Sequence, residues 1–281
     1  MTSRQRGLYE TLITEALEAE LARPSALFVG QSPLHPAEAA DRIALHVGRV
    51  VERALDALGD DERVAVGAEL ARRLVELAAG TAEAASLVAE RPVAPARVLR
   101  SVRAVRPDGE PERIAAPLIP LLDTTLLTNA PGEPRVGSQV LAEIASADRI
   151  DLVMAFVRRS GIQPLLEALR VHCAAGRALR VLTTTYTGST EPQAIEALRS
   201  LGAEIRVSYD ESSTRLHAKA WLFHRSSGFS TAYIGSSNLT HSAQVSGLEW
   251  NVRVSAARNA PVVEKVAAVF ESYWNGNDFV P

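Results

Sequence analysis

The central run of this sequence is Leu216-His217-Ala218-Lys219-Ala220-Trp221-Leu222-Phe223. Its short apolar pattern predicts a β-strand over residues 216–223. Side chains two positions apart in a strand point to the same side, so His217 and Lys219 project together. Leu216, Ala218 and Ala220 face the other way. The run therefore aims an imidazole and an ammonium group at one spot.

A turn of small residues follows this strand, with the sequence Ile234-Gly235-Ser236-Ser237-Asn238. Such a turn allows close backbone approach, and the hydroxyl of Ser236 and the amide of Asn238 can bond phosphate oxygens. Farther along, Glu249 and Asn251 form a same-face pair on the next predicted strand. We expect the carboxylate of Glu249 to orient an imidazole and to stabilise its protonated form.

The surrounding sequence alternates between strand and helix patterns. Strand patterns cover residues 150–157, 179–184, 204–208, 216–223, 232–234 and 250–254, and helical patterns cover residues 136–147, 162–175, 191–201 and 262–274. This alternation predicts an α/β fold in which helices cover the faces of a sheet. The sequence contains no recognisable second copy of the unit.

The N-terminal part has a different pattern. Residues 3–90 are rich in Ala, Leu, Glu and Arg, with apolar residues at helical spacing and breaks at proline and glycine. Residues 91–111 hold several prolines and arginines and are typical of a connector. We therefore predict a helical N-terminal region over residues 1–105 and a second domain over residues 106–281.

Composition narrows the class of protein. Hydrophobic residues make up 47% of the 281 and charged residues 22%, as in ordinary globular proteins. The net charge of −3 means that any nucleic-acid contact must use a local basic surface. The single cysteine, Cys173, excludes an internal disulfide and a cysteine-based zinc cluster. With neither a signal-peptide core nor a spanning segment at the N-terminus, we expect a cytoplasmic protein that contacts no membrane.

The motifs together resemble the half-site signature of the phospholipase D superfamily, His-x-Lys followed by Gly-Ser-x-Asn. The match is His217-x-Lys219 with Gly235-Ser236-x-Asn238, and nuclease-type members also place a glutamate after the asparagine, as Glu249 is here. The resemblance covers about residues 118–275. The sequence around residues 227–233 and 247–252 looks like the N-terminal phospholipase D-like domain of bacterial DEAD/DEAH-box helicases. One position departs from the family, because His224 stands where an aspartate is usual.

This resemblance implies a metal-independent phosphodiesterase with no cofactor. One histidine attacks the phosphate to give a phosphohistidine, and a second protonates the leaving oxygen and then activates water. Lys219, Ser236 and Asn238 would neutralise charge on the phosphate oxygens. Together with His217 and Glu249 these form the expected catalytic set, and Gly235, Ser237 and Asn251 are expected to bind substrate. No set of carboxylates or histidines stands at metal-ligand spacing.

Counting the motif predicts an assembly. The reaction needs two histidines and two lysines, but His-x-Lys occurs once, so we expect a homodimer with a shared site. The expected substrate is nucleic acid, DNA rather than RNA, with a helicase domain or partner and a role in defence or repair. The alternatives are a nucleic-acid-binding module with weak turnover, and a lipid phosphodiesterase.

Three other features have both a functional and a structural explanation. The run from Thr183 to Thr190 would bind an anion where a strand ends, but an N-cap at Ser189 or Thr190 is favoured. His241 follows Asn238 closely and has no partner residue in the sequence. His172 and Cys173 lie in a helical pattern and are expected to be packing residues.

Overall fold

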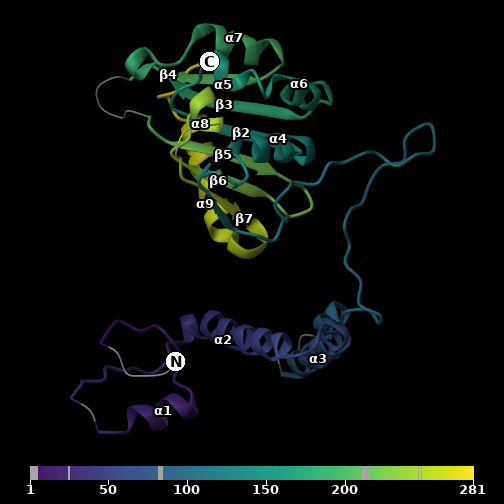
Figure 1. Ribbon diagram of the computed structural model, residues 1–281, viewed down its shortest axis with the longest axis vertical. Coiled ribbons are helices and arrows are strands. Elements are labelled where there is room, and N and C mark those ends of the chain that lie inside the picture. The colour runs from purple at the N-terminus through teal and green to yellow at the C-terminus, as the bar shows by residue number, and fades with distance from the viewer. Residues whose placement is uncertain (1–5, 25, 82–84, 211–215, 246, 248) are drawn as a thin grey trace. The chain divides into compact units, whose positions relative to one another are not determined.

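The computed structural model describes residues 6–281 except 25, 82–84, 211–215, 246 and 248. The chain divides into two compact units, Met1–Val102 and Arg103–Pro281. Each has its own secondary structure (Figure 1). The motifs singled out in the sequence, at residues 217–219, 235–238 and 249–251, all belong to the second unit.

The first unit is helical, as the sequence predicted. Its elements are α1 (Glu15–Leu21), α2 (Pro36–Asp56), α3 (Asp60–Thr81) and the 3-10 helix η1 (Ala85–Glu90). The N-terminus of α2 is fixed by Pro36 and by the His35 side chain, which accepts a bond from the backbone N–H of Ala37. None of the described residues in α1, α2 or α3 is buried.

The second unit is built on one seven-stranded mixed sheet in the order β1-β7-β6-β5-β2-β3-β4. The strands are β1 (Thr125–Leu127), β2 (Arg149–Met154), β3 (Ala178–Thr184), β4 (Glu204–Ser208), β5 (Lys219–His224), β6 (Thr231–Gly235) and β7 (Asn251–Ser255). Strands β2, β3 and β4 are parallel because helices connect them, whereas β5, β6 and β7 form an antiparallel meander.

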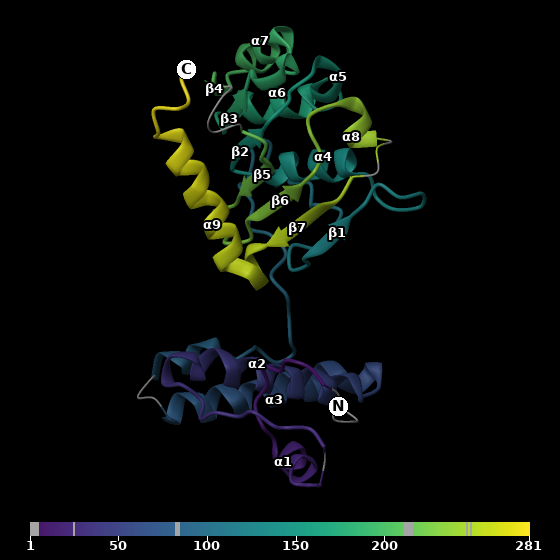
Figure 2. The ribbon, with the colours of Figure 1, turned by 90° about the vertical axis from the view of Figure 1, so that its left-hand side faces the viewer.

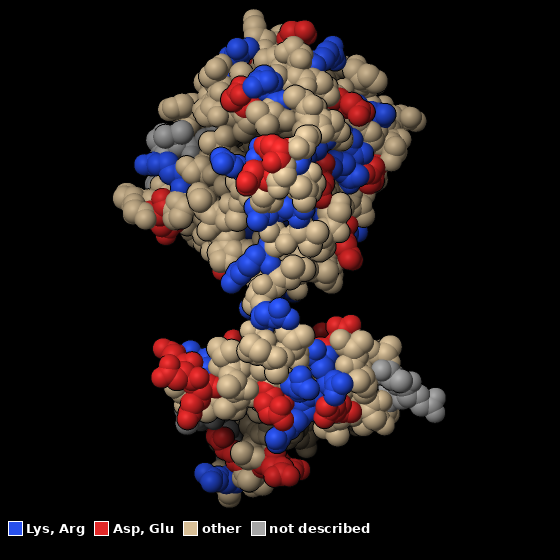
Figure 3. Space-filling model, turned by 90° about the vertical axis from the view of Figure 1, so that its right-hand side faces the viewer, with Lys and Arg blue, Asp and Glu red and all other residues tan. Residues whose placement is uncertain are grey.

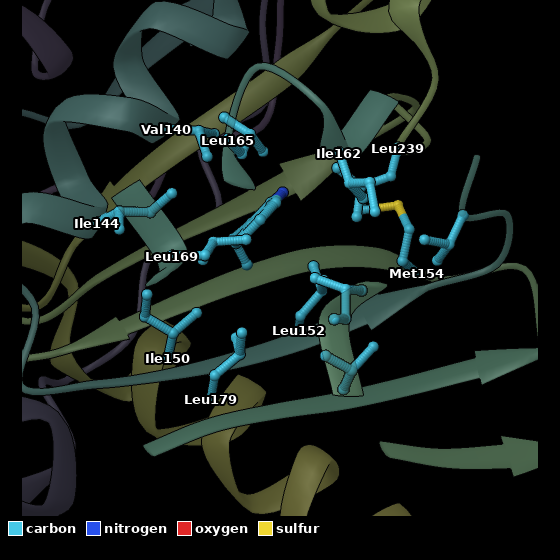
Figure 4. Packing of buried hydrophobic residues seen from close by; sticks show 14 of the residues in the cluster. Val140, Ile144, Ile150, Leu152, Met154, Ile162, Leu165, Leu169, Leu179 and Leu239 are labelled. Atoms are coloured by element: carbon cyan, nitrogen blue, oxygen red, sulfur yellow. The ribbon is translucent and has the colours of Figure 1, made fainter. Parts of the chain in front are cut away.

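Helices cover both faces of this sheet, which confirms the predicted α/β architecture (Figure 2). The helices are α4 (Val136–Ser146), α5 (Arg159–Ile162), α6 (Leu166–Ala174), α7 (Pro192–Ser200), α8 (His241–Val245) and α9 (Ala256–Trp274). The main core packs residues of α4 and α6, such as Ile144 and Leu169, against Ile150, Leu152 and Leu179 of the sheet (Figure 4). On the opposite face α9 contributes Val263 and Phe270 to two smaller clusters.

A buried carboxylate ties the strands to α4. Glu143 is fully buried and accepts bonds from Arg225, from Arg253 at 2.8 Å, from Thr231 at 2.9 Å and from the Tyr233 hydroxyl at 3.1 Å. Burial and then the charge of Glu143 raise the pKa of Tyr233. Two guanidinium groups offset the cost of burying this charge, so removal of Glu143 would leave two buried guanidinium groups without an acidic partner among the described contacts.

Some element boundaries differ from those predicted. Helix α9 begins at Ala256 instead of residue 262. The backbone is non-helical at Asn259, just before Pro261, and this break explains why the sequence pattern placed the start of the helix at residue 262. Strand β1 was not predicted, because three residues are too short for a periodic signal. Strands β5 and β7 begin at Lys219 and Asn251, so His217 and Glu249 lie just before their strands.

Candidate active site

The three sequence motifs meet at one edge of the sheet. Lys219, the first residue of β5, pairs with Met154, the last residue of β2. Gly235, the last residue of β6, pairs with Asn251, the first of β7. The antiparallel connections thus bring the start of two strands beside the end of two others, and side chains from all three motifs can converge there.

His217 and Lys219 contact each other at this edge. The Lys219 ammonium nitrogen lies 3.2 Å from His217 Nδ1 and donates to the His217 backbone oxygen at 2.7 Å. His217 is exposed, whereas Lys219 is only 7% exposed. Burial lowers the pKa of Lys219, and the charge of Glu249 acts in the opposite direction. Burial separates the ammonium from water. A bound phosphate would supply the negative charge that stabilises it there.

The choice of lysine at this position stands out against the composition. The sequence has 30 basic residues, of which only Lys219 and Lys265 are lysines. Arginine has a planar, forked head group, whereas the ammonium is compact and can sit beside an imidazole. Position 219 therefore uses the residue type that this chain otherwise avoids.

The small-residue turn packs tightly against the start of β7. A Cβ at Gly235 would lie 2.2 Å from the Trp250 backbone oxygen and 2.7 Å from Asn251 Cα, so only glycine fits. The Ser236 backbone N–H donates to Trp250 O at 3.0 Å, and the Ser236 hydroxyl donates to the Glu249 carboxylate. These bonds set the position of the Ser236 hydroxyl next to Glu249.

Asn238 connects the turn to the end of β2. Its side-chain oxygen accepts a bond from the backbone N–H of Phe156 at 3.2 Å. The ring of Phe156 meets the His217 ring edge-on, with 6.1 Å between centroids. One residue therefore contacts both the imidazole and the asparagine. Sequence reasoning missed Phe156, because the apolar pattern placed it inside the strand predicted over residues 150–157, whereas β2 ends at Met154.

The structure places the remaining predicted site residues in supporting positions. Ser237 and Asn251 are buried, and Asn251 donates to the Ser237 hydroxyl at 2.7 Å. This pair lies behind the turn, where it can brace the turn more readily than contact a substrate. Glu249 bonds to Ser236, and among the described contacts it has none with the His217 ring. Its nearest electrostatic effect is on Lys219.

The predicted N-cap at Ser189 or Thr190 is wrong. Helix α7 begins at Pro192 with Glu191 as its N-cap. The Thr190 hydroxyl instead donates to Ala155 O at 3.3 Å and accepts from Val157 N at 3.4 Å. The Thr190 hydroxyl therefore bonds to residues that follow β2 and does not cap the helix. The local sequence does not show that these residues lie nearby.

His241 and His172 both lie in helices. His241 is the first residue of α8 and is exposed. His172 is buried in α6, where burial lowers its pKa, and Cys173 beside it packs against the core with its thiol pKa raised by burial. His172 and Cys173 are packing residues, as predicted.

His224 lies at the opposite end of β5 from Lys219. Its Nε2 is 2.6 Å from Asp151 Oδ2, and Arg180 makes two further bonds to the same carboxylate at 2.7 and 2.8 Å. Burial alone would raise the pKa of Asp151, but the bonds from His224 and Arg180 hold it below its ordinary value. The unusual histidine is therefore part of an ion-pair cluster away from the site.

The described residues contain neither a metal-binding cluster nor a helix able to cross a membrane. Among them, no group of three or more His, Cys, Asp or Glu side chains is placed to hold a metal ion. No helix in the described ranges has the length and apolar character needed to span a bilayer.

Comparison with known proteins identifies relatives of the second unit. Residues 140–274 match a family described as cardiolipin synthase, PLD-like domain. Among solved structures, the phospholipase D family member Nuc from Salmonella typhimurium is 20% identical, over 54% of this chain and 95% of its own, with a TM-score of 0.40. NucT from Helicobacter pylori is 12% identical, over 53% and 94%, with a TM-score of 0.43.

A third similar structure is a phosphatidylserine synthase from Haemophilus influenzae, 10% identical over 56% of this chain and 39% of its own, with a TM-score of 0.38. A search of curated proteins finds no match. The family match begins within α4 and ends with α9, so it contains all the residues of the site described above.

Proposed function

The chain belongs to the phospholipase D superfamily through its second unit, and from that premise we propose that it cleaves the phosphodiester backbone of nucleic acid. The predicted phospholipase D-like sheet is confirmed. The observation that carries the proposal is the contact between His217 and Lys219, 3.2 Å apart, at the sheet edge that also presents Ser236 and Asn238. This combination offers a nucleophile and donors for phosphate oxygens.

The proposed reaction has two displacements at phosphorus. A His217 ring nitrogen forms a bond to phosphorus while the bond to the leaving oxygen breaks, and a second histidine gives that oxygen its proton. The second histidine then takes a proton from water, whose oxygen displaces His217. Lys219, Ser236 and Asn238 would hold the non-bridging oxygens throughout, so the chemistry needs no metal ion.

For Glu249 we propose a role other than orienting an imidazole, on the basis of its bond to Ser236. The Ser236 hydroxyl donates to Glu249, and its oxygen accepts a bond from the backbone N–H of Trp250 at 3.0 Å. A phosphate arriving beside Lys219 would compete for the hydroxyl proton. We assign Glu249 to positioning Ser236 and to tuning Lys219, and Ser237 with Asn251 to bracing the turn.

A second copy of the chain would supply the second histidine. His-x-Lys occurs once in the sequence, so a single chain provides half of the required groups. Support comes from a row of exposed aliphatic residues next to the site. Leu126, Val252 and Ile234 are direct cross-strand neighbours and are 44%, 40% and 37% exposed. Such a row suits an isologous contact that covers it.

We also propose that the two units are separate domains of a cytoplasmic enzyme that acts with a helicase, on DNA in preference to RNA. The helical unit has no buried residue among those described in α1 to α3, which suits a region that completes its packing with a partner. An interaction assay with a helicase would test this part independently of catalysis.

The central experiment incubates the protein with labelled single-stranded DNA, duplex DNA, RNA and phosphatidylcholine vesicles, with and without excess EDTA. We expect nucleic acid to be cut in EDTA and the lipid to remain intact. Binding without cleavage would favour the weak-turnover module, and lipid hydrolysis alone would favour the lipid enzyme. Activity that disappears with EDTA and returns with Mg²⁺ would contradict the mechanism.

A further inference from the structure

The connector carries a three-residue repeat that the proposed active site does not use. Arginine recurs at every third position in Arg97-Val98-Leu99-Arg100-Ser101-Val102-Arg103-Ala104-Val105-Arg106. These ten residues include no aspartate or glutamate, although the chain as a whole has a net charge of −3. The other 271 residues therefore carry −7, and this stretch is a local concentration of positive charge.

The repeat is exposed along its whole length. Residues 97–104 belong to no helix or strand, and every residue from 97 to 106 is exposed. Leu99 and Val102 are each 81% exposed. In Figure 1 the segment is drawn as a bare loop, and the stretch that joins the two units carries blue atoms in Figure 3. A flexible tether is usually rich in glycine and serine, so joining the units does not account for this composition.

The arginines are largely free to bind a ligand. Arg97 and Arg100 have no acidic partner among the described contacts. Arg103 donates to the backbone oxygen of Glu112 at 3.4 Å, and Arg106 forms an exposed pair with Asp108 at 3.3 Å. Exposed pairs of this kind contribute little stability, so a stronger anion can displace them.

We infer that residues 97–106 bind the phosphate groups of a nucleic-acid strand. A guanidinium group binds phosphate through two parallel hydrogen bonds. In an extended backbone with three residues per turn, the repeat places the arginines along one side and the aliphatic residues along another. The identification of the polyanion as nucleic acid rests on the proposed function, while the presence of an anion-binding segment rests on the repeat itself.

An anionic membrane surface is the less favoured partner. Interfacial segments bind membranes as amphipathic helices with tryptophan, phenylalanine or leucine on the apolar side. Residues 97–104 form no helix, and among residues 97–106 only Leu99 is of these three types. Their backbone groups would lose water at a lipid surface without gaining internal hydrogen bonds. A solvated phosphate backbone imposes no such cost.

The test compares two fourfold variants of the full chain. The first replaces Arg97, Arg100, Arg103 and Arg106 by glutamine, and the matched control makes the same change at the exposed residues Arg49, Arg73, Arg170 and Arg199. Both variants also carry His217→Ala, so that the DNA probe is not cut during the measurement. Fluorescence anisotropy with a labelled 30-nucleotide DNA strand is measured at 50 and 200 mM NaCl.

We expect the repeat variant to bind the strand at least about 10-fold more weakly at 50 mM NaCl. The slope of log K against log[salt] should become shallower by about 2 to 3, since each lost phosphate contact on a single strand removes about 0.7. The control should change affinity less than about threefold. A version with lysine at the four positions should keep most of the salt dependence, because the charge remains.

A small chromogenic phosphodiester separates this inference from the proposed function. With His217 restored, the repeat variant should hydrolyse it at the wild-type rate. Unchanged strand affinity and salt slope in the repeat variant would overturn the inference, even if the enzyme cleaves DNA. Loss of binding to phosphatidylserine vesicles with unchanged strand affinity would also overturn it. If no phosphodiester is cleaved but strand binding still depends on the repeat, only the proposed function fails.

Discussion

Strand β5 has a histidine near each end, and the two lie in opposite surroundings. His217, just before the strand, is exposed and 3.2 Å from the Lys219 ammonium. His224, its last residue, is 2.6 Å from Asp151, whose side chain is 1% exposed. A phosphate can reach the exposed ring of His217, whereas the buried carboxylate of Asp151 fixes the ring of His224 in place. Neighbours, and not residue type, separate the histidine that we propose as the nucleophile from the one in the ion-pair cluster.

The largest contrast is expected from His217→Ala. It should lower the rate of phosphodiester cleavage by at least about 10³-fold, since it removes the nucleophile. Acid quenching of the wild-type reaction should trap an acid-labile phosphohistidine, located at His217 by mass spectrometry. Far-UV circular dichroism would check that the variant is folded. Cleavage by His217→Ala at the wild-type rate would remove the basis of the assignment.

Lys219→Met should lower the cleavage rate by about 10²- to 10³-fold, because the phosphate loses its nearest cation. Stability should be unchanged or raised by up to about 1 kcal/mol, since burial disfavours the charged lysine. Calorimetry and cleavage assays measure the two effects. A large loss of stability would show that Lys219 holds the fold.

The same residue predicts a pH dependence. Because burial lowers the pKa of Lys219, its ammonium is lost as pH rises through a value below the ordinary lysine pKa of about 10.4. Wild-type activity should therefore decline at high pH starting below that value. Lys219→Met should lack this additional decline and keep only the pH dependence that the histidines impose.

Gly235→Ala should lower activity by about 10- to 100-fold and the free energy of unfolding by about 2 kcal/mol, since the added Cβ would push the turn from β7. The matched control is Gly48→Ala in α2, where a Cβ meets nothing within 4 Å. That change should raise stability by about 0.5–1 kcal/mol. Equal effects of the two substitutions on activity would show that turn placement does not matter.

His224→Ala should have the smallest effect on cleavage, less than about threefold, because the residue lies at the other end of the strand. It should cost about 1–2 kcal/mol of stability at neutral pH through the lost bond to Asp151. The lowered pKa of Asp151 makes this contribution present above about pH 4 and lost as pH falls through the folded value. Complete loss of activity in folded protein would instead make His224 catalytic.

The sequence alone determined the parts of this protein that depend on short separations. Period-two and helical patterns gave most strands and helices, and the spacing of His217 and Lys219 requires no knowledge of distant residues. Likewise Gly235 to Asn238 forms one continuous turn. Local geometry fixes how such neighbours lie, whatever the rest of the chain does.

Only the tertiary structure decided which distant residues meet. Phe156 contacts Asn238 across 82 positions, Glu143 holds Arg225 and Arg253 across 82 and 110, and Asp151 holds His224 across 73. Glu249 accepts a bond from Ser236, and the Thr190 hydroxyl bonds to Ala155 after the end of β2 and does not cap a helix. Each outcome depends on strand order and on which polar groups are buried together, because a buried charge or donor takes whichever partner the fold brings within reach.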